Sequence, residues 1–256
     1  MSTTKGLAPV RIIPRLDIKA PNLVKGIQLE GLRVMGDPAE HALRYYNDGA
    51  DELLYVDIVA SLYERNSLSG VVGETASKIF VPLTVGGGMR SLEDFATMFR
   101  SGADKVAINT AAIRHPDILT QASRAYGAQA VVLSIEAKRQ GGSWEAYTDN
   151  GREHTGLDVL EWCRKAVALG AGEILLTSVD REGTRKGFDL DLIRAVSKSV
   201  PVPIIACGGA GSVEHITAAI EAGADAIALA TLLHYKDFTI GSLKAALRDR
   251  GYSVRL

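Results

Sequence analysis

The chain has 256 residues, of which 46% are hydrophobic and 23% are charged. This composition suits one domain with a large buried core. A formal net charge of −1 excludes the basic surface that non-specific nucleic-acid binding requires. The sequence also has no apolar run near the ~18 residues of a membrane-spanning helix. We therefore expect no nucleic-acid partner and no membrane partner.

Cysteine usage and the first residues bear on the compartment. The opening stretch, MSTTKGLAPVR, lacks the apolar core of a secretion signal. Cys163 and Cys207 fall in a predicted helix and a predicted strand, so we expect no disulfide. The five histidines are scattered without metal-ligand spacing. These features predict a cytoplasmic protein with no metal and no cofactor.

Short apolar segments alternate with amphipathic helical segments along the whole chain. The apolar segments are nearly continuous in Val, Ile and Leu, which is typical of strands buried on both faces. The predicted strands span residues 11–17, 52–57, 81–84, 105–108, 130–135, 173–177, 203–206 and 226–229. Eight strand-then-helix units predict one (β/α)8 TIM barrel domain over residues 1–256, with 1–10 as an N-terminal extension.

Helix starts and long insertions punctuate this pattern. Asp37 before Pro38 is a capping signal, and Ser91 with Asp94 resembles a capping box. A long loop is predicted over 18–37 after the first strand, and a hairpin-like piece over 141–150 after the fifth. Long loops at the carboxyl ends of barrel strands often shape substrate sites.

The sequence repeats itself once. VPLTVGGG, ending at Gly88, is echoed by VPIIACGG, ending at Gly209, and the shift is 209 − 88 = 121 residues. Thr110 and Thr231 are also 231 − 110 = 121 residues apart. LDIK at 16–19 is echoed by IEAK at 135–138, a shift of 135 − 16 = 119. The repeat predicts two duplicated half-barrels with equivalent sites on opposite sides of one mouth.

Glycine-rich turns follow the third and seventh predicted strands. Glycines at 86–88 and 208–209 let backbone N–H groups approach an anion closely. Asn109-Thr110 and Ala230-Thr231 end the fourth and eighth strands and add polar donors. Two matched sets predict two phosphate sites and a substrate with a phosphate at each end. The alternative is that these glycines only make tight turns between strands and helices.

Two carboxylates end the first and fifth strands. By the repeat, Asp17 and Glu136 face each other across the mouth, where they can share acid and base work if their pKa values differ. The alternative is ion pairing with Lys19 and Lys138, which lie two residues further on and on the same strand face. Further acids end the second and sixth strands: Asp57, Asp180 and Glu182.

Charged residues begin four strands at the opposite end of the barrel: Arg11, Glu52, Lys105 and Glu173. Two bases and two acids can close a ring at the bottom of the lumen, since buried charges persist only when paired. Residues at this end of a barrel usually serve stability. The ring could also gate a small neutral molecule, and the spacing leaves both interpretations open.

Several stretches together resemble one known family over residues 11–256, nearly the whole chain. They are RIIPRLDIK, LVKG, VPLTVGGG, SGADKVAINTAA, GAGEILLTS, DREGT and PIIACGGAG. The family is the cyclase subunit of imidazole glycerol phosphate synthase, from histidine biosynthesis, and GADKVAINTAA favours it over its isomerase relative. The resemblance implies a glutaminase subunit docked on the N-terminal barrel face. Ammonia from that partner would pass the charged gate and the lumen to reach a bisphosphorylated ribulosyl substrate, giving imidazole glycerol phosphate and aminoimidazole carboxamide ribotide.

The resemblance also assigns roles to residues. Asp17 matches a catalytic acid that protonates the departing carbonyl oxygen, and Glu136 stands where the family has a second catalytic aspartate. Lys25 matches a substrate contact in a mobile loop. The implied phosphate ligands are Gly88, Asn109 and Thr110 in one half and Gly183, Gly209 and Thr231 in the other. The implied ammonia gate is Arg11, Glu52, Lys105 and Glu173.

Departures from the family cluster near the mouth. Glu136 carries an added methylene, and a misplacement of ~1 Å can cost ~100-fold in rate. Arg15 replaces a small residue on the strand face of Asp17, where a guanidinium would lower the pKa of that acid. Pro21 and the Asp149-Asn150 pair are further changes. Besides the cyclase, two hypotheses stay open: a paralogue that channels ammonia to a surface-glycan sugar or specialised metabolite, and a non-catalytic ammonia conduit.

Overall fold

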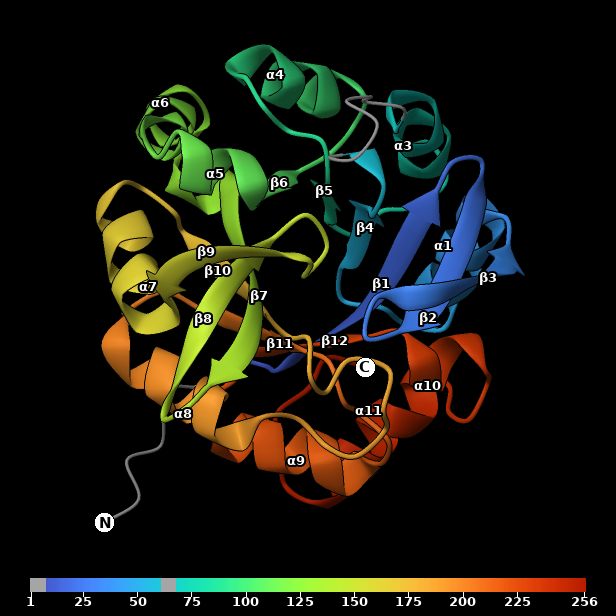
Figure 1. Ribbon diagram of the computed structural model, residues 1–256. Coiled ribbons are helices and arrows are strands. Elements are labelled where there is room, and N and C mark those ends of the chain that lie inside the picture. The colour runs from blue at the N-terminus through green and yellow to red at the C-terminus, as the bar shows by residue number, and fades with distance from the viewer. Residues whose placement is uncertain (1–7, 61–67) are drawn as a thin grey trace.

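A closed parallel barrel forms the centre of the computed structural model, which describes residues 8–60 and 68–256 (Figure 1). Around the barrel the strands are β1 (Arg11–Lys19), β4 (Leu53–Asp57), β5 (Leu83–Gly86), β6 (Lys105–Ile108), β7 (Val131–Gln140), β10 (Glu173–Ser178), β11 (Ile204–Cys207) and β12 (Ala226–Leu229). Parallel pairing of β12 with β1 closes the ring. The predicted (β/α)8 barrel is confirmed.

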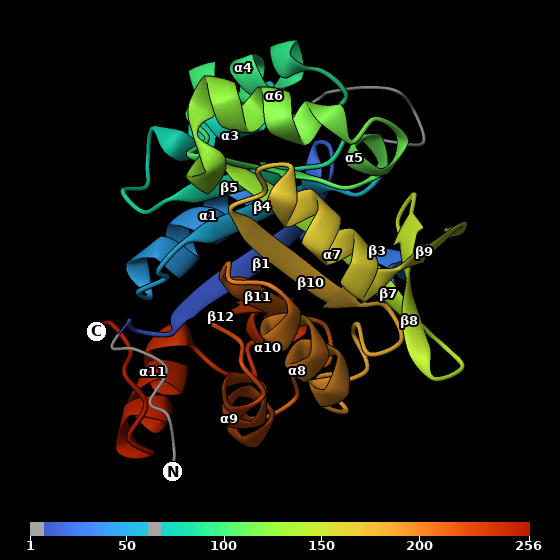
Figure 2. The ribbon, with the colours of Figure 1, turned by 90° about the vertical axis from the view of Figure 1, so that its left-hand side faces the viewer.

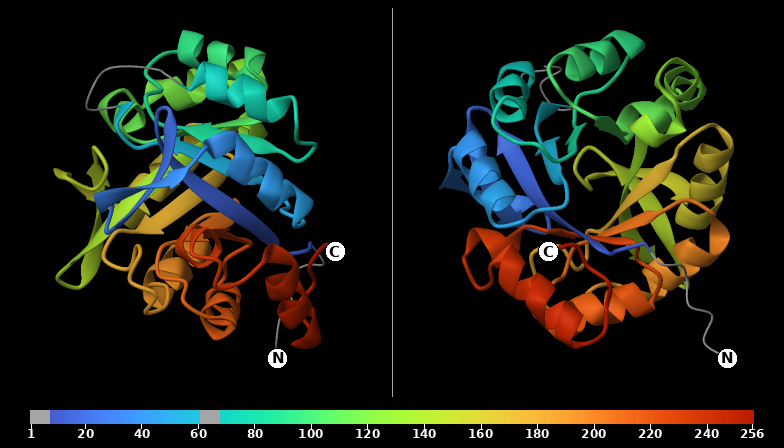
Figure 3. Two further views of the ribbon diagram at one scale, coloured as in Figure 1. Left: turned by 90° about the vertical axis from the view of Figure 1, so that its right-hand side faces the viewer. Right: turned by 180° about the vertical axis from the view of Figure 1, so that it is seen from behind.

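Helices surround this barrel on the outside (Figure 1, Figure 3). They are α1 (Pro38–Asn47), α3 (Ser69–Ala76), α4 (Leu92–Arg100), α5 (Thr110–Arg114), α6 (Asp117–Tyr126), η1 (Ala128–Ala130), α7 (Val159–Ala168), α8 (Leu190–Ser199), α9 (Val213–Glu221), α10 (Thr231–His234) and α11 (Ile240–Asp249). Asp37 caps α1 through the Glu40 N–H at 2.8 Å. Ser91 and Asp94 form the expected capping box of α4. None of these helices is long and apolar enough to cross a membrane.

The two half-barrels correspond in sequence position as the repeat predicts. β11 begins 204 − 83 = 121 residues after β5, and β12 begins 226 − 105 = 121 residues after β6. The predicted N-terminal extension lies largely outside the described residues, since 1–7 are not among them. All eight predicted strands are present, with boundaries that move by a few residues.

Each half carries an antiparallel hairpin beyond its first strand. The segment predicted as a loop over 18–37 forms β2 (Asn22–Ile27) and β3 (Glu30–Gly36), because β1 continues past the barrel and pairs with β2. The predicted hairpin after β7 is confirmed as β8 (Ser143–Thr148) and β9 (Glu153–Asp158). Both hairpins project from the end of the barrel opposite the chain termini (Figure 2).

The core has two layers. The larger layer lies between strands and helices, and Phe95 and Met98 of α4 are fully buried there. The smaller layer fills the lumen with Ile13, Leu54, Ala107, Val132, Leu175, Ile205, Cys207, Ala226 and Ala228. Cys163 and Cys207 are both free and buried, as expected. The lumen is therefore lined by packed apolar side chains between two polar ends.

Candidate functional site

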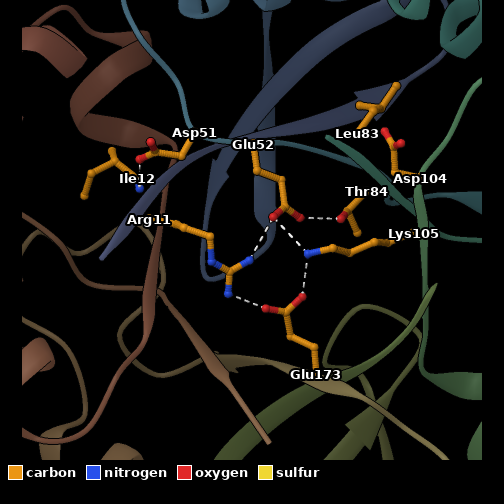
Figure 4. A network of polar contacts seen from close by, with 9 residues as sticks. All are labelled: Arg11, Ile12, Asp51, Glu52, Leu83, Thr84, Asp104, Lys105 and Glu173. Carbon is orange, nitrogen blue, oxygen red and sulfur yellow. Dashed lines mark hydrogen bonds and ion pairs between the residues drawn. The ribbon is translucent and has the colours of Figure 1, made fainter. Parts of the chain in front are cut away.

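A ring of four charged side chains closes the N-terminal end of the lumen (Figure 4). Arg11 Nη1 lies 2.9 Å from Glu52 Oε2, and its Nη2 contacts Glu173 Oε1. Lys105 Nζ lies 3.0 Å from Glu52 Oε2 and 2.8 Å from Glu173 Oε2. Thr84 Oγ1 adds a 2.5 Å hydrogen bond to Glu52. The predicted ring therefore forms, and each carboxylate bridges both cations.

The ring is stable because its charges balance. Glu52 and Glu173 are 2% and 5% exposed, and a buried carboxylate without a cation would be costly. Burial alone would lower the pKa of Arg11, but the charges of Glu173 and Glu52 outweigh it and raise that pKa. A cavity of about 440 Å³ at this end is lined by Arg11, Lys105 and Glu173 among others. The ring therefore lies between an external hollow and the lumen.

The first half of the mouth holds a spacious cavity. Gly88, Asn109 and Thr110, the predicted phosphate ligands, line about 290 Å³ of it together with Glu136. Gly87 and Gly88 have φ of 94° and 75°, and a Cβ on Gly87 would lie 2.2 Å from the Asp57 carbonyl oxygen. This turn therefore requires glycine, and the three predicted ligands do share one site.

The second half of the mouth is much tighter. Gly183, Gly209 and Thr231 line a cavity of only about 20 Å³, and Arg15 is part of its wall. Gly183 and Thr231 also line a larger hollow of about 630 Å³, which includes Lys25. The predicted ligands of this half are thus together, but the two half-sites differ in size.

Asp17 is bound to Arg15 inside the barrel. The two side chains are almost fully buried, and Arg15 Nε lies 2.8 Å from Asp17 Oδ1. Burial alone would raise the pKa of Asp17, but the positive charges of Arg15 and Lys25 outweigh it and hold that pKa below its usual value. The predicted effect of Arg15 on Asp17 is confirmed. Among described ion pairs, none joins Asp17 to Lys19, so that alternative is wrong.

Glu136 lies in a different environment. Its Oε2 accepts a 2.7 Å hydrogen bond from the Gly151 N–H, and no ion pair of the described chain involves it, Lys138 included. Burial raises the pKa of Glu136 to about 7, although the Gly151 hydrogen bond and the charge of Arg15 act to lower it. The pKa values of Asp17 and Glu136 are therefore well separated, as an acid–base pair requires. Their order is the reverse of the one that Asp17 as acid would need.

Lys25 is buried and paired rather than free in a mobile loop. It is 2% exposed, its Nζ contacts Glu182 Oε1, and it donates to the Gly26 carbonyl at 2.7 Å. Glu182 Oε2 accepts from the Leu29 N–H at 3.1 Å, and the Glu182 carbonyl accepts from the Gln28 N–H at 3.0 Å. The β2–β3 hairpin is thereby fixed onto the loop after β10. Sequence reasoning noted Glu182 as an acid but missed this pairing.

Comparisons with known proteins agree with this geometry. A family profile described as "Histidine biosynthesis protein" matches residues 11–239. A Legionella pneumophila protein described as "Imidazole glycerol phosphate synthase subunit HisF" is 60% identical over 82% of this chain and 99% of its own length. Proteins of the same description from Myxococcus xanthus and Bifidobacterium longum are 52% and 49% identical, each over 96% of this chain and 97% and 98% of their own lengths. The chain therefore belongs to the histidine biosynthesis protein family and, within it, groups with the HisF subunits of imidazole glycerol phosphate synthase.

Proposed function

We propose that the protein is an ammonia-dependent cyclase and lyase that forms imidazole glycerol phosphate and aminoimidazole carboxamide ribotide from a bisphosphorylated ribulosyl substrate. The observation that carries this proposal is the pair of carboxylates, Asp17 and Glu136, at the mouth of an apolar lumen whose other end is a charged ring. Ammonia is small and neutral, so it can cross an apolar lumen that excludes ions.

The separated pKa values suggest how the two carboxylates share the chemistry. Glu136, with a pKa of about 7, can give and take a proton near neutral pH. Asp17 remains a carboxylate and can accept a proton from the nitrogen that attacks. Gly88, Asn109 and Thr110 would hold one phosphate, and Gly183, Gly209 and Thr231 the other, with Lys25 beside the second.

The relatives are named as subunits, which implies that they work in a complex. We place a glutaminase partner on the N-terminal face, over the ring of Arg11, Glu52, Lys105 and Glu173. Phe80 offers that partner an exposed apolar contact. It precedes β5, is 85% exposed and has its ring centre 6.2 Å from that of Tyr46. The two free, buried cysteines suit the reducing cytoplasm.

One assay tests the activity. The purified protein is mixed with the bisphosphorylated ribulosyl substrate and an ammonium salt at alkaline pH, and loss of substrate is followed. Turnover at a rate comparable with a competent homologue is the expected result. No turnover beside an active control would reject this activity.

A second candidate is a paralogue that passes ammonia from a glutaminase to a different phosphorylated or sugar acceptor. The tight second half-site favours it, because its wall contains Arg15 and its cavity is only about 20 Å³, against about 290 Å³ in the first half-site. The two candidates separate in a paired assay. Glutaminase activation by this chain without consumption of the ribulosyl substrate would support the second.

A further inference from the structure

Arg15 is the residue that makes the two half-sites different. By the internal repeat, its counterpart in the other half is Ser134, since 134 − 15 equals the 136 − 17 = 119 that relates Glu136 to Asp17. Ser134 lines the first cavity of about 290 Å³, whereas Arg15 lines the second cavity of about 20 Å³. The same place in the fold thus carries a small hydroxyl in one half and a guanidinium in the other.

Arg15 reaches across the inside of the barrel from β1 to β10 and β11. Its Nη1 donates to Thr177 Oγ1 at 3.1 Å and to Cys207 Sγ at 3.4 Å, while its Nε donates to Asp17. These contacts fix the side chain in one position just below the mouth. A guanidinium held in this way loses little further entropy when it binds a ligand.

One edge of this guanidinium has no partner among the described residues. Arginine has five N–H donors, and the hydrogen bonds of Arg15 within the described part of the chain use only Nε and Nη1. Nη2, which has no partner in the described part of the chain, is not fully enclosed by protein atoms, and Arg15 lines the second cavity. The donors of Nη2 are therefore available to a group that enters the cavity.

We propose that Arg15 is an anion-binding residue of the second half-site, where Nη2 donates to a phosphate or carboxylate oxygen of the acceptor and so determines which acceptors the protein takes. The proposal rests on the proposed function, because it treats the mouth as the acceptor site. Gly183 and Gly209, with φ of 72° and 109°, line the same cavity, and neither has a side chain of its own to fill it.

The charges around the site allow an anion to bind. The carboxylates that interact with Arg15 are Asp17, Glu182 and, from the first half, Glu136. Asp17 and Glu182 are each already bound to a cation, Arg15 or Lys25. The second half-site is therefore neutral rather than acidic before a ligand enters. An oxyanion that meets Nη2 gains a charge-assisted hydrogen bond in a site sheltered from water.

The test is a titration of the isotope-labelled full chain with inorganic phosphate and, separately, with lactate, followed by NMR. The Arg15 Nε–H and the Gly209 amide report on the second half-site, and the Gly88 amide reports on the first. We expect Arg15 and Gly209 to shift together, and the Gly209 midpoint to weaken at least about ten-fold in Arg15→Ser. The Gly88 midpoint stays unchanged in that variant. Response to phosphate alone or to lactate alone identifies the oxyanion.

Two further variants make the outcome decisive. Arg15→Lys keeps the charge and guards against loss of fold, so it should retain part of the affinity. Asp17→Asn keeps an oxygen that accepts from Arg15 Nε and removes a negative charge beside the site, so anion binding should be unchanged or stronger. A loss equal to that of Arg15→Ser would assign the affinity to the intact Arg15–Asp17 pair rather than to the Nη2 donors, and would overturn the proposal. The proposal also fails if neither probe shifts Arg15, or if Arg15→Ser binds as well as the wild type. A Gly88 amide that ignores phosphate would instead count against the proposed function.

Discussion

Both ends of the barrel lumen carry charged side chains, but they arrange them differently. At the bottom, each carboxylate bridges both cations, so the ring is one closed circuit. At the mouth, Arg15–Asp17 and Lys25–Glu182 are separate pairs in the second half, and Glu136 in the first half forms no ion pair within residues 8–60 and 68–256. A closed ring of ion pairs suits a gate that must stay electrically neutral. Separate ion pairs and an unpaired acid suit proton transfer and ligand exchange.

The largest expected effect follows from replacing the acid at the centre of the mouth. Asp17→Asn keeps an oxygen that accepts from Arg15 Nε but removes the proton-accepting carboxylate. We expect ammonium-dependent turnover to fall about 1,000-fold, within the range of general acid–base catalysis. Steady-state kinetics measure it, with circular dichroism to verify the fold. Activity within ten-fold of wild type would show that Asp17 only holds Arg15 in place.

The second prediction concerns the pair that fixes the β2–β3 hairpin. Glu182→Gln leaves the buried Lys25 without its ion-pair partner, which costs about 3 kcal/mol in comparable cases. Because the hairpin can open to hydrate Lys25, the loss should appear as about 100-fold faster amide exchange over residues 22–36, measured by mass spectrometry. The control is Glu74→Gln, which breaks an exposed pair with Lys78 and should leave exchange unchanged. Unchanged exchange in Glu182→Gln would mean that backbone contacts alone hold the hairpin.

The two ends of the barrel lumen also differ in how far their structure can be predicted from the sequence. The bottom ring follows from strand starts alone, because parallel strands in a barrel bring their first residues to one rim. The sequence predicts a loop where the hairpin over 22–36 lies, because the strands form only by antiparallel pairing with β1. Lys25 and Glu182 are 157 residues apart, and no local pattern joins them.

For the mouth, the sequence predicts which residues meet and the direction of one pKa shift, but not the size of the shifts or of the cavities. The repeat places Asp17 opposite Glu136, and the position of Arg15 on the strand gives the direction of its effect on the Asp17 pKa. Burial is what raises the pKa of Glu136, and burial depends on how the β8–β9 turn closes over it through Gly151. The volumes of the two half-sites likewise depend on side-chain packing across several strands.

The third prediction uses the pKa of Glu136, which burial raises from 4.5 to about 7. The folded chain thus holds this proton more tightly than the unfolded chain. The resulting stability is fully present below about pH 4.5 and is lost as the pH rises through 7. Glu136 is half-buried by its exposed surface, so solvent screening reduces the full ~3 kcal/mol. We therefore expect the wild type to lose about 2 kcal/mol relative to Glu136→Gln between pH 4.5 and 8. Urea unfolding at several pH values measures it, and a constant difference would contradict a buried acid.

The smallest effect is expected at the bottom ring. Lys105→Met leaves Glu52 and Glu173 with Arg11 as their remaining cation, so the circuit opens but both carboxylates stay paired. In the complex with the glutaminase, we expect glutamine-dependent turnover to fall about five-fold, about 1 kcal/mol in barrier height, because the passage beside the ring is disturbed. Turnover with added ammonium should stay near the wild-type rate, since ammonia then reaches the mouth from solution. An equal loss in both assays would mean that the ring serves the stability of the barrel. The two ends of the lumen would then differ in structure alone, and not as a site of ammonia transport and a site of chemistry.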